Sequence, residues 1–140
     1  MKGKTLEEWI KFYEEKSHVK YQPPDKRVRR FYFADKGFAE IGTSKDMVII
    51  HQLCGDAKFW KQVAEVLAME RGINHLGTWC IRNIEPYIRF FEVEIIKTED
   101  LGDGLKRYHG KFKNTGKPAI FTPNFKAQNG NIGYLVTWEI

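Results

Sequence analysis

The sequence predicts a mixed α/β protein, with a central, mostly antiparallel twisted sheet flanked by about three helices. Two observations lead to this class. Short apolar or alternating runs, which are typical of strands, recur along most of the 140 residues. Only a few segments show the 3.6-residue spacing of apolar side chains that is typical of helices. Because the chain shows no repeat, low-complexity tract or composition shift, we expect one domain over residues 1–140.

The composition is that of a globular protein, with 42% hydrophobic and 29% charged residues. No apolar stretch approaches the length of a membrane span, and the N-terminus has no secretory leader, so we expect a cytoplasmic protein without a membrane partner. Cys54 and Cys80 lie in apolar, strand-like contexts and are expected to be reduced thiols. The cysteines and histidines are not spaced as metal ligands, so we predict no metal site.

The first half of the chain reads as helix, three strands, helix. Thr5-x-x-Glu8 is a capping box and predicts a helix to about Lys16. A loop with two prolines follows. Strands are predicted over Val28–Ala34, Phe38–Thr43 and Met47–Ile50, joined as an antiparallel meander. A helix then runs to Arg71, with Trp60, Val63, Ala64, Leu67 and Ala68 on one face.

The second half reads mostly as strands. Ile73–Ile81 is a second buried strand, and Ile84–Phe91 a short helix with Pro86 in its first turn. Further strands are predicted over Val93–Thr98, Leu105–Phe112, Pro118–Thr122 and Asn131–Ile140. As an edge strand, the last of these could pair with a second copy of the chain in a homodimer.

The segment between the buried strand and the second helix has the composition of an anion site. The first amides of a helix lack intrahelical partners, and Gly55 lets a backbone approach a ligand closely. Ala57 is small, and Lys58 could contact a phosphate. An ordinary strand-to-helix turn is the alternative interpretation.

Two motifs resemble those of the GNAT superfamily of acyl-CoA N-acyltransferases, including its small phage-borne members. They are Gln52-x-x-Gly55-x-Ala57 and Asn83-x-x-Pro86-Tyr87-x-x-Phe90-Phe91, and the resemblance covers about Val28 to Lys97. It implies a GNAT-like fold and acetyl-CoA as the cofactor. The cofactor-binding residues that it implies are Gln52, Leu53, Cys54, Gly55, Asp56, Ala57, Lys58 and Asn83. Asn83 would also serve as the N-cap of the following helix.

Acyl transfer to an amine needs a base and an acid near the thioester. His51 and Glu40 are the candidate bases, and Tyr87 could protonate the departing thiolate. His51 has the more suitable ordinary pKa, although it could instead be a hydrogen-bonded histidine at a strand end. Glu40 is expected to face solvent, and Tyr87 could simply cover the core. Where many GNAT members carry a general-acid tyrosine, this chain has Phe90.

Net charge is +5, and residues 101–140 hold six Lys or Arg against two acidic residues. Such a surplus could attract a nucleic acid or coenzyme phosphates, or could be a solvated face. Three functions follow from these observations. The first is an acetyl-CoA-dependent acyltransferase with a small-molecule or protein amine as acceptor. The second is a catalytically inactive GNAT-like interaction module, and the third a basic nucleic-acid-associated protein.

Overall fold

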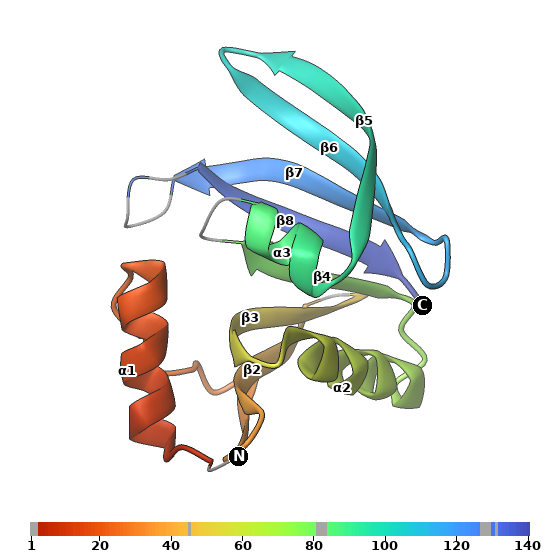
Figure 1. Cartoon of the computed structure of the whole chain (residues 1–140). Coiled ribbons are helices and arrows are strands. Elements are labelled where there is room, and N and C mark those ends of the chain that lie inside the picture. Colours follow the sequence, from red (N-terminus) through yellow and green to blue (C-terminus); the bar gives the residue numbers. More distant parts are fainter. Residues whose placement is uncertain (1–2, 45, 81–83, 127–129, 131) are drawn as a thin grey trace.

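The computed structural model describes all residues except 1–2, 45, 81–83, 127–129 and 131 (Figure 1). The helices are α1 (Leu6–Ser17), α2 (Ala57–Glu70) and α3 (Glu85–Phe90). The strands are β1 (Val28–Phe33), β2 (Gly37–Ser44), β3 (Met47–Gly55), β4 (His75–Cys80), β5 (Val93–Gly102), β6 (Leu105–Phe112), β7 (Pro118–Lys126) and β8 (Ile132–Glu139).

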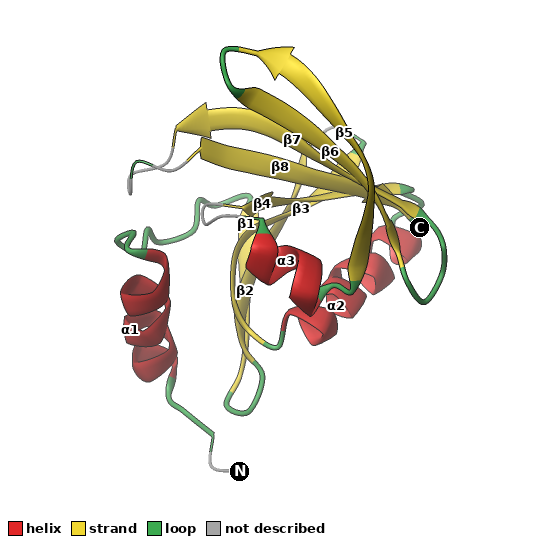
Figure 2. Cartoon of the chain, turned by 45° about the horizontal axis from the view of Figure 1, so that its top comes forward, coloured by secondary structure: helices red, strands yellow, loops and turns green. Residues whose placement is uncertain are grey.

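The strands form one sheet in the order β1-β2-β3-β4-β8-β7-β6-β5. Its neighbours pair antiparallel, with β3 and β4 as the parallel exception in the described part of the chain. That pair needs a crossover, which α2 supplies. Helix α1 lies on one side of β2 and β3, and α2 and α3 lie on the other (Figure 2). The predicted meander of β1, β2 and β3 is confirmed.

The mixed α/β class is confirmed, but the predicted GNAT-like arrangement of the sheet is wrong. Strands make up 49% of the described residues, and all eight described strands belong to one sheet that lacks that arrangement. The prediction that the C-terminal strand is an edge strand open to a second copy of the chain is also wrong, because β8 pairs with β4 on one side and β7 on the other. The edges of the sheet are β1 and β5. The prediction failed because motifs within residues 28–97 say nothing about how the later strands pair, which depends on contacts distant in sequence.

Three strands run at least four residues past their predicted C-terminal ends. β3 continues through the segment expected to be a loop and ends at Gly55, because β2 pairs with it up to that residue. β5 runs to Gly102 beside β6, and β7 runs to Lys126 beside β8. Pro123 is tolerated inside β7 because the register with β8 shifts between Pro123 and Phe125. Turn-forming residues predicted that these strands end too early. In the structure, pairing with the neighbouring strand continues through those residues.

The main core lies between the sheet and α2, as the helical stripe predicts. Trp60, Ala64 and Ala68 have no exposed surface, and Val63 and Leu67 pack against them. Asp56 caps the helix at its start, and Gly72, with φ +67°, follows its end. Hydrophobic burial against the sheet therefore holds α2 in place.

A second cluster covers the opposite face of β2 and β3. It consists of the buried side chains of Trp9 and Tyr13 from α1 with Phe38 and Cys54 from the sheet. The capping box of Thr5 and Glu8 is present at the start of α1, as predicted. Because α1 covers this face and the main core with α2 covers the other, residues 37–42 of β2 are all buried.

Candidate functional site

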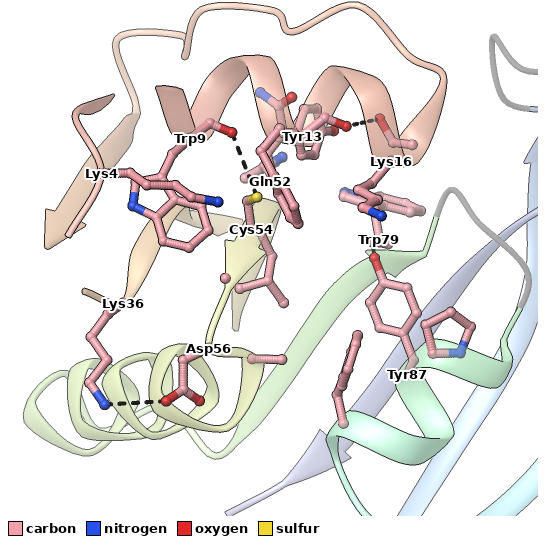
Figure 3. Close-up of a pocket in the computed structure, with 18 of the residues that line it drawn as sticks. Lys4, Trp9, Tyr13, Lys16, Lys36, Gln52, Cys54, Asp56, Trp79 and Tyr87 are labelled. Atoms are coloured by element: carbon pink, nitrogen blue, oxygen red, sulfur yellow. Dashed lines mark hydrogen bonds and ion pairs between the residues drawn. The ribbon is translucent and has the colours of Figure 1, made fainter. Parts of the chain in front are cut away.

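A cavity of about 720 Å³ opens where the two parallel strands part (Figure 3). The pairing of β3 with β4 ends at Ile50 and Thr78, and the buried Thr78 hydroxyl donates a hydrogen bond to the Ile50 carbonyl there. Beyond that point β3 pairs only with β2, and β4 pairs only with β8. One backbone edge of residues 51–55 therefore has no strand partner in the described structure and lies along the cavity.

The cavity passes between the helices on the two sides of the sheet. Its lining includes Trp9, Phe12 and Lys16 from α1, residues 51–57 from β3 and the start of α2, and Trp79 from β4. Pro86, Tyr87 and Phe90 from α3 complete it. A large, partly apolar cavity with a few convergent polar groups is typical of a small-molecule site.

His51 is the extra residue of a β-bulge. Ile41 pairs with Ile50 and Glu40 pairs with Gln52, which leaves His51 without an opposite residue. Such bulges re-aim side chains and are common beside binding sites. Gly42 makes room for the ring, because a Cβ there would lie 3.4 Å from His51 Nε2. The bulge thus turns the imidazole toward the face that α1 covers.

Burial lowers the pKa of His51 below its ordinary value, against the opposing effects of the negative charges of Glu40 and Asp25. The imidazole is consequently neutral at pH 7 and is able to accept a proton. His51 also lines the cavity. This position and charge state fit the predicted role as a base.

The sequence led us to expect that Glu40 faces solvent, which is wrong. The side chain is only 1% accessible to solvent. Its carboxylate accepts hydrogen bonds from the Tyr21 hydroxyl and from Gln52 Nε2 at 2.6 Å, and pairs with Arg30 Nε at 3.4 Å. Burial, and after it the hydrogen bond to Glu40, raise the pKa of Tyr21 to about 12. The expectation failed because α1 and the segment that follows it cover this second face of β2. Glu40 does not line the cavity.

Most of the predicted cofactor-binding residues line the cavity, but not all of them do. Gln52 to Ala57 all line the cavity, whereas Lys58 points elsewhere and pairs with Glu92 at 2.6 Å. The Gln52 side chain is held by Glu40 and by the Gln22 carbonyl, at 2.7 Å. Asn83 falls outside the described residues. Of this set, the backbone of β3 is the part best placed to meet a ligand.

The start of α2 is already occupied by its own side chain. Asp56 accepts a hydrogen bond from the Phe59 amide at 3.1 Å and pairs with Lys36 at 3.3 Å (Figure 3). The Phe59 amide, followed by Lys36, lowers the pKa of Asp56, so the carboxylate is charged. Gly55, with φ +104°, is required because a Cβ would lie 2.2 Å from the Lys36 carbonyl oxygen. The close approach at Gly55 therefore serves the β2–β3 pairing.

Tyr87 extends from α3 toward β4, where its hydroxyl lies 3.4 Å from the Trp79 carbonyl oxygen (Figure 3). Phe90, which is 43% exposed, lies one turn later on the cavity rim. Tyr87 thus brings a hydroxyl group from α3 to the cavity lining, and its role as a proton donor stays a prediction.

Sequence reasoning missed the contribution of α1. Trp9, Phe12, Tyr13 and Lys16 line the cavity at the i, i+3, i+4, i+7 spacing of one helix face. The Lys4 ammonium lies 4.2 Å and that of Lys16 5.5 Å from the centre of the Phe12 ring. The spacing was available as a signal, but it is equally typical of ordinary core packing.

The chain matches no protein-family model, no curated protein and no solved structure. The resemblance to GNAT acyltransferases therefore stays a prediction. Among the described residues, no group of three or more His, Cys, Asp or Glu side chains could hold a metal ion, and no helix could span a membrane.

Proposed function

We propose that the chain binds an acyl thioester such as acetyl-CoA in the cavity and transfers the acyl group to an amine. The observation that carries the proposal is the parting of two parallel strands, which leaves the backbone edge of residues 51–55 facing a cavity. An unpaired strand edge offers a row of alternating donors and acceptors. The amide-bearing arm of coenzyme A is complementary to such a row, as an added strand would be.

The chemistry needs a polarised carbonyl and two proton transfers. A backbone amide near the bulge would donate to the thioester oxygen and stabilise the charge that forms when the amine nitrogen attacks the carbonyl carbon. Neutral His51 would take the proton that the attacking nitrogen loses. The carbon–sulfur bond then breaks, and the Tyr87 hydroxyl would donate a proton to the departing thiolate. The products are an amide and the free thiol.

The charges around the cavity bear on where phosphates would lie. The Asp56 carboxylate at the start of α2 disfavours an anion at those amides, whereas Lys4 and Lys16 form no ion pair within 4 Å among the described residues. Their charges favour an anionic group at the α1 side of the cavity. This differs from the loop that the resemblance implies.

Acetyl-CoA is expected to raise the unfolding temperature of the protein. A ligand bound only by the native state stabilises it by about 2.7 kcal/mol at a hundredfold excess over Kd. Phe90→Glu adds a negative charge to the exposed rim and should reduce the shift, because coenzyme phosphates are repelled. Phe90→Gln introduces a side chain of the same size as glutamate but without the charge, so the shift in unfolding temperature should be retained. Thermal unfolding with and without millimolar acetyl-CoA measures both.

Absence of any shift in the wild type would contradict binding, and equal shifts in the two Phe90 variants would place the ligand elsewhere. Gly55→Glu is unsuitable as a blocking variant, since the collision with Lys36 would disturb the sheet itself.

His51 should make stability depend on pH. Because its native pKa is lowered, the unfolded chain binds the proton more tightly, and stability contributed by neutral His51 is lost as pH falls below about 6.5. Urea unfolding of the wild type and of His51→Gln from pH 8 to pH 5 measures the difference. Between pH 8 and pH 5 the free energy of unfolding should fall more for the wild type than for His51→Gln.

His51→Gln should also reduce catalysis. Release of free thiol from acetyl-CoA with an amine should fall about 10²- to 10⁴-fold in the variant.

A further inference from the structure

A second, smaller hollow lies on the α2 side of the sheet, away from α1. Its lining comes from the start of β1, from β2 and β3, and from the C-terminal part of α2. The floor is apolar, with Ile41, Val48 and Leu67, of which the first two are almost completely buried. At about 60 Å³ it is an order of magnitude smaller than the cavity at the parted strands. It therefore has room for one small group.

The charged side chains around this hollow are all arginines: Arg27, Arg29 and Arg71. They come from three separate elements, the segment before β1, β1 itself and the end of α2. No acidic side chain belongs to the lining. Within the described part of the chain, Arg29 and Arg71 form no ion pair, and Arg27 pairs only with the exposed Asp25, at 3.5 Å.

Two of these guanidinium groups are held by neighbours that leave their charge unneutralised. Arg29 lies 5.1 Å from the centre of the Phe31 ring. Arg71 donates a hydrogen bond to the Thr43 hydroxyl. Like charges gathered around one hollow repel one another, and a bound anion removes that repulsion. Planar guanidinium groups also match the oxygens of a phosphate in pairs.

We propose that the hollow formed by Arg27, Arg29 and Arg71 binds a phosphate group of a phosphorylated ligand. Its size fits one phosphate and excludes a whole nucleotide from the hollow itself. The apolar floor makes no hydrogen bond, so recognition comes from the rim. The site lies on the opposite side of the sheet from α1, and it does not rest on the proposed acyl transfer.

Each arginine also has a local structural explanation. Arg71 stands at the C-terminal end of α2, where a cation is stabilising, and Arg29 is stabilised by its ring contact. If these structural roles were the whole explanation, replacing one of the arginines would change the stability of the protein but not its affinity for an anion. Arg29→Gln is the discriminating variant, because Arg29 is exposed and belongs to no helix end.

Inorganic phosphate and a short mixed-sequence single-stranded oligonucleotide are the two probes, titrated separately while the NMR signals of the arginine Nε–H groups are recorded. Both contain phosphate, and neither contains the pantetheine arm of coenzyme A. For the wild type we expect saturable shifts of the Arg29 and Arg71 signals, weakening as salt rises. Arg29→Gln should weaken binding by about tenfold or more.

Arg107→Gln is the matched control, because Arg107 lies on β6, far along the strand order, and pairs with Glu99 at 3.2 Å. It should change the affinity less than twofold. Saturation by phosphate alone would assign the site to a small phosphorylated ligand, and tighter saturation by the oligonucleotide would assign it to a nucleic-acid backbone. Absence of saturable shifts, or equal losses in the Arg29 and Arg107 variants, would overturn the proposal.

Discussion

Replacing Trp60 by alanine is expected to lower the free energy of unfolding by about 3–5 kcal/mol, the range for a large aromatic removed from a core. Trp60 has no exposed surface, and its ring lies 4.9 Å from that of Phe59 and 6.0 Å from that of Phe33. Its indole nitrogen donates to the Lys36 carbonyl at 2.8 Å. The side chain thus joins α2 to the β1–β2 turn beside the cavity.

Urea unfolding followed by circular dichroism measures this loss. Met69→Ala on the same helix is the control, because Met69 is 64% exposed and should change stability by about 0.5 kcal/mol or less. If Trp60→Ala does not fold, Trp60→Phe keeps most of the volume and removes the donor, at an expected cost of about 1 kcal/mol. The Lys36 carbonyl retains its bond from the Asp56 amide in both variants. A loss below 1 kcal/mol in Trp60→Ala would show that α2 is not anchored here.

The helices were predictable because their signals are local. The capping box at Thr5 and Glu8, and the apolar stripe of α2 from Trp60 to Ala68, depend on residues within a few turns of each other. The β1–β3 meander was predictable for the same reason, since each strand pairs with its neighbour in sequence. The position of β8 between β4 and β7 has no local signal.

The site was predictable in outline and not in detail. The sequence predicted a ligand segment at residues 52–58, and residues 52–57 of that segment line the cavity. It interpreted Gly55 and Asp56 as a ligand cradle, although Gly55 fits against Lys36 and Asp56 caps α2. A capping aspartate and a tightly paired glycine produce the same short pattern as an anion loop. Only the partner strand distinguishes them, and it lies earlier in the chain.

The burial of Glu40 was missed because side chains alternate between the two faces of a strand, and one face of β2 was expected to be exposed to solvent. In the structure both faces are covered, by α2 on one side and by α1 on the other. A buried carboxylate needs partners, and Tyr21, Arg30 and Gln52 supply them from three segments. Gln52 belongs both to this network and to the cavity lining, so Glu40 supports the proposed site through Gln52 without lining the cavity itself.

Replacing Glu40 by alanine is accordingly expected to cost about 2–4 kcal/mol. Breaking a buried ion pair from one side typically costs about 3–5 kcal/mol, but Arg30 is 32% exposed and regains water, which reduces the loss. The variant also leaves Gln52 with only the Gln22 carbonyl as a partner among the described residues. Chemical unfolding at pH 7 gives the value. Glu139→Ala is the control, because that carboxylate is 68% exposed in its pair with His75 and should matter by about 0.5 kcal/mol or less.

Glu40→Gln separates the charge from the volume. It keeps the shape of the side chain and removes the negative charge that raises the pKa of Tyr21. Spectrophotometric titration should therefore find the pKa of Tyr21 below about 12 in this variant, with burial, the largest cause, still raising it. A double-mutant cycle with Tyr21→Phe should give a coupling of about 0.5–3 kcal/mol, as expected for residues in one network. Additive losses and an unchanged tyrosine titration would mean that Glu40 acts through packing alone, and that the contacts of β3 at the cavity do not depend on its charge.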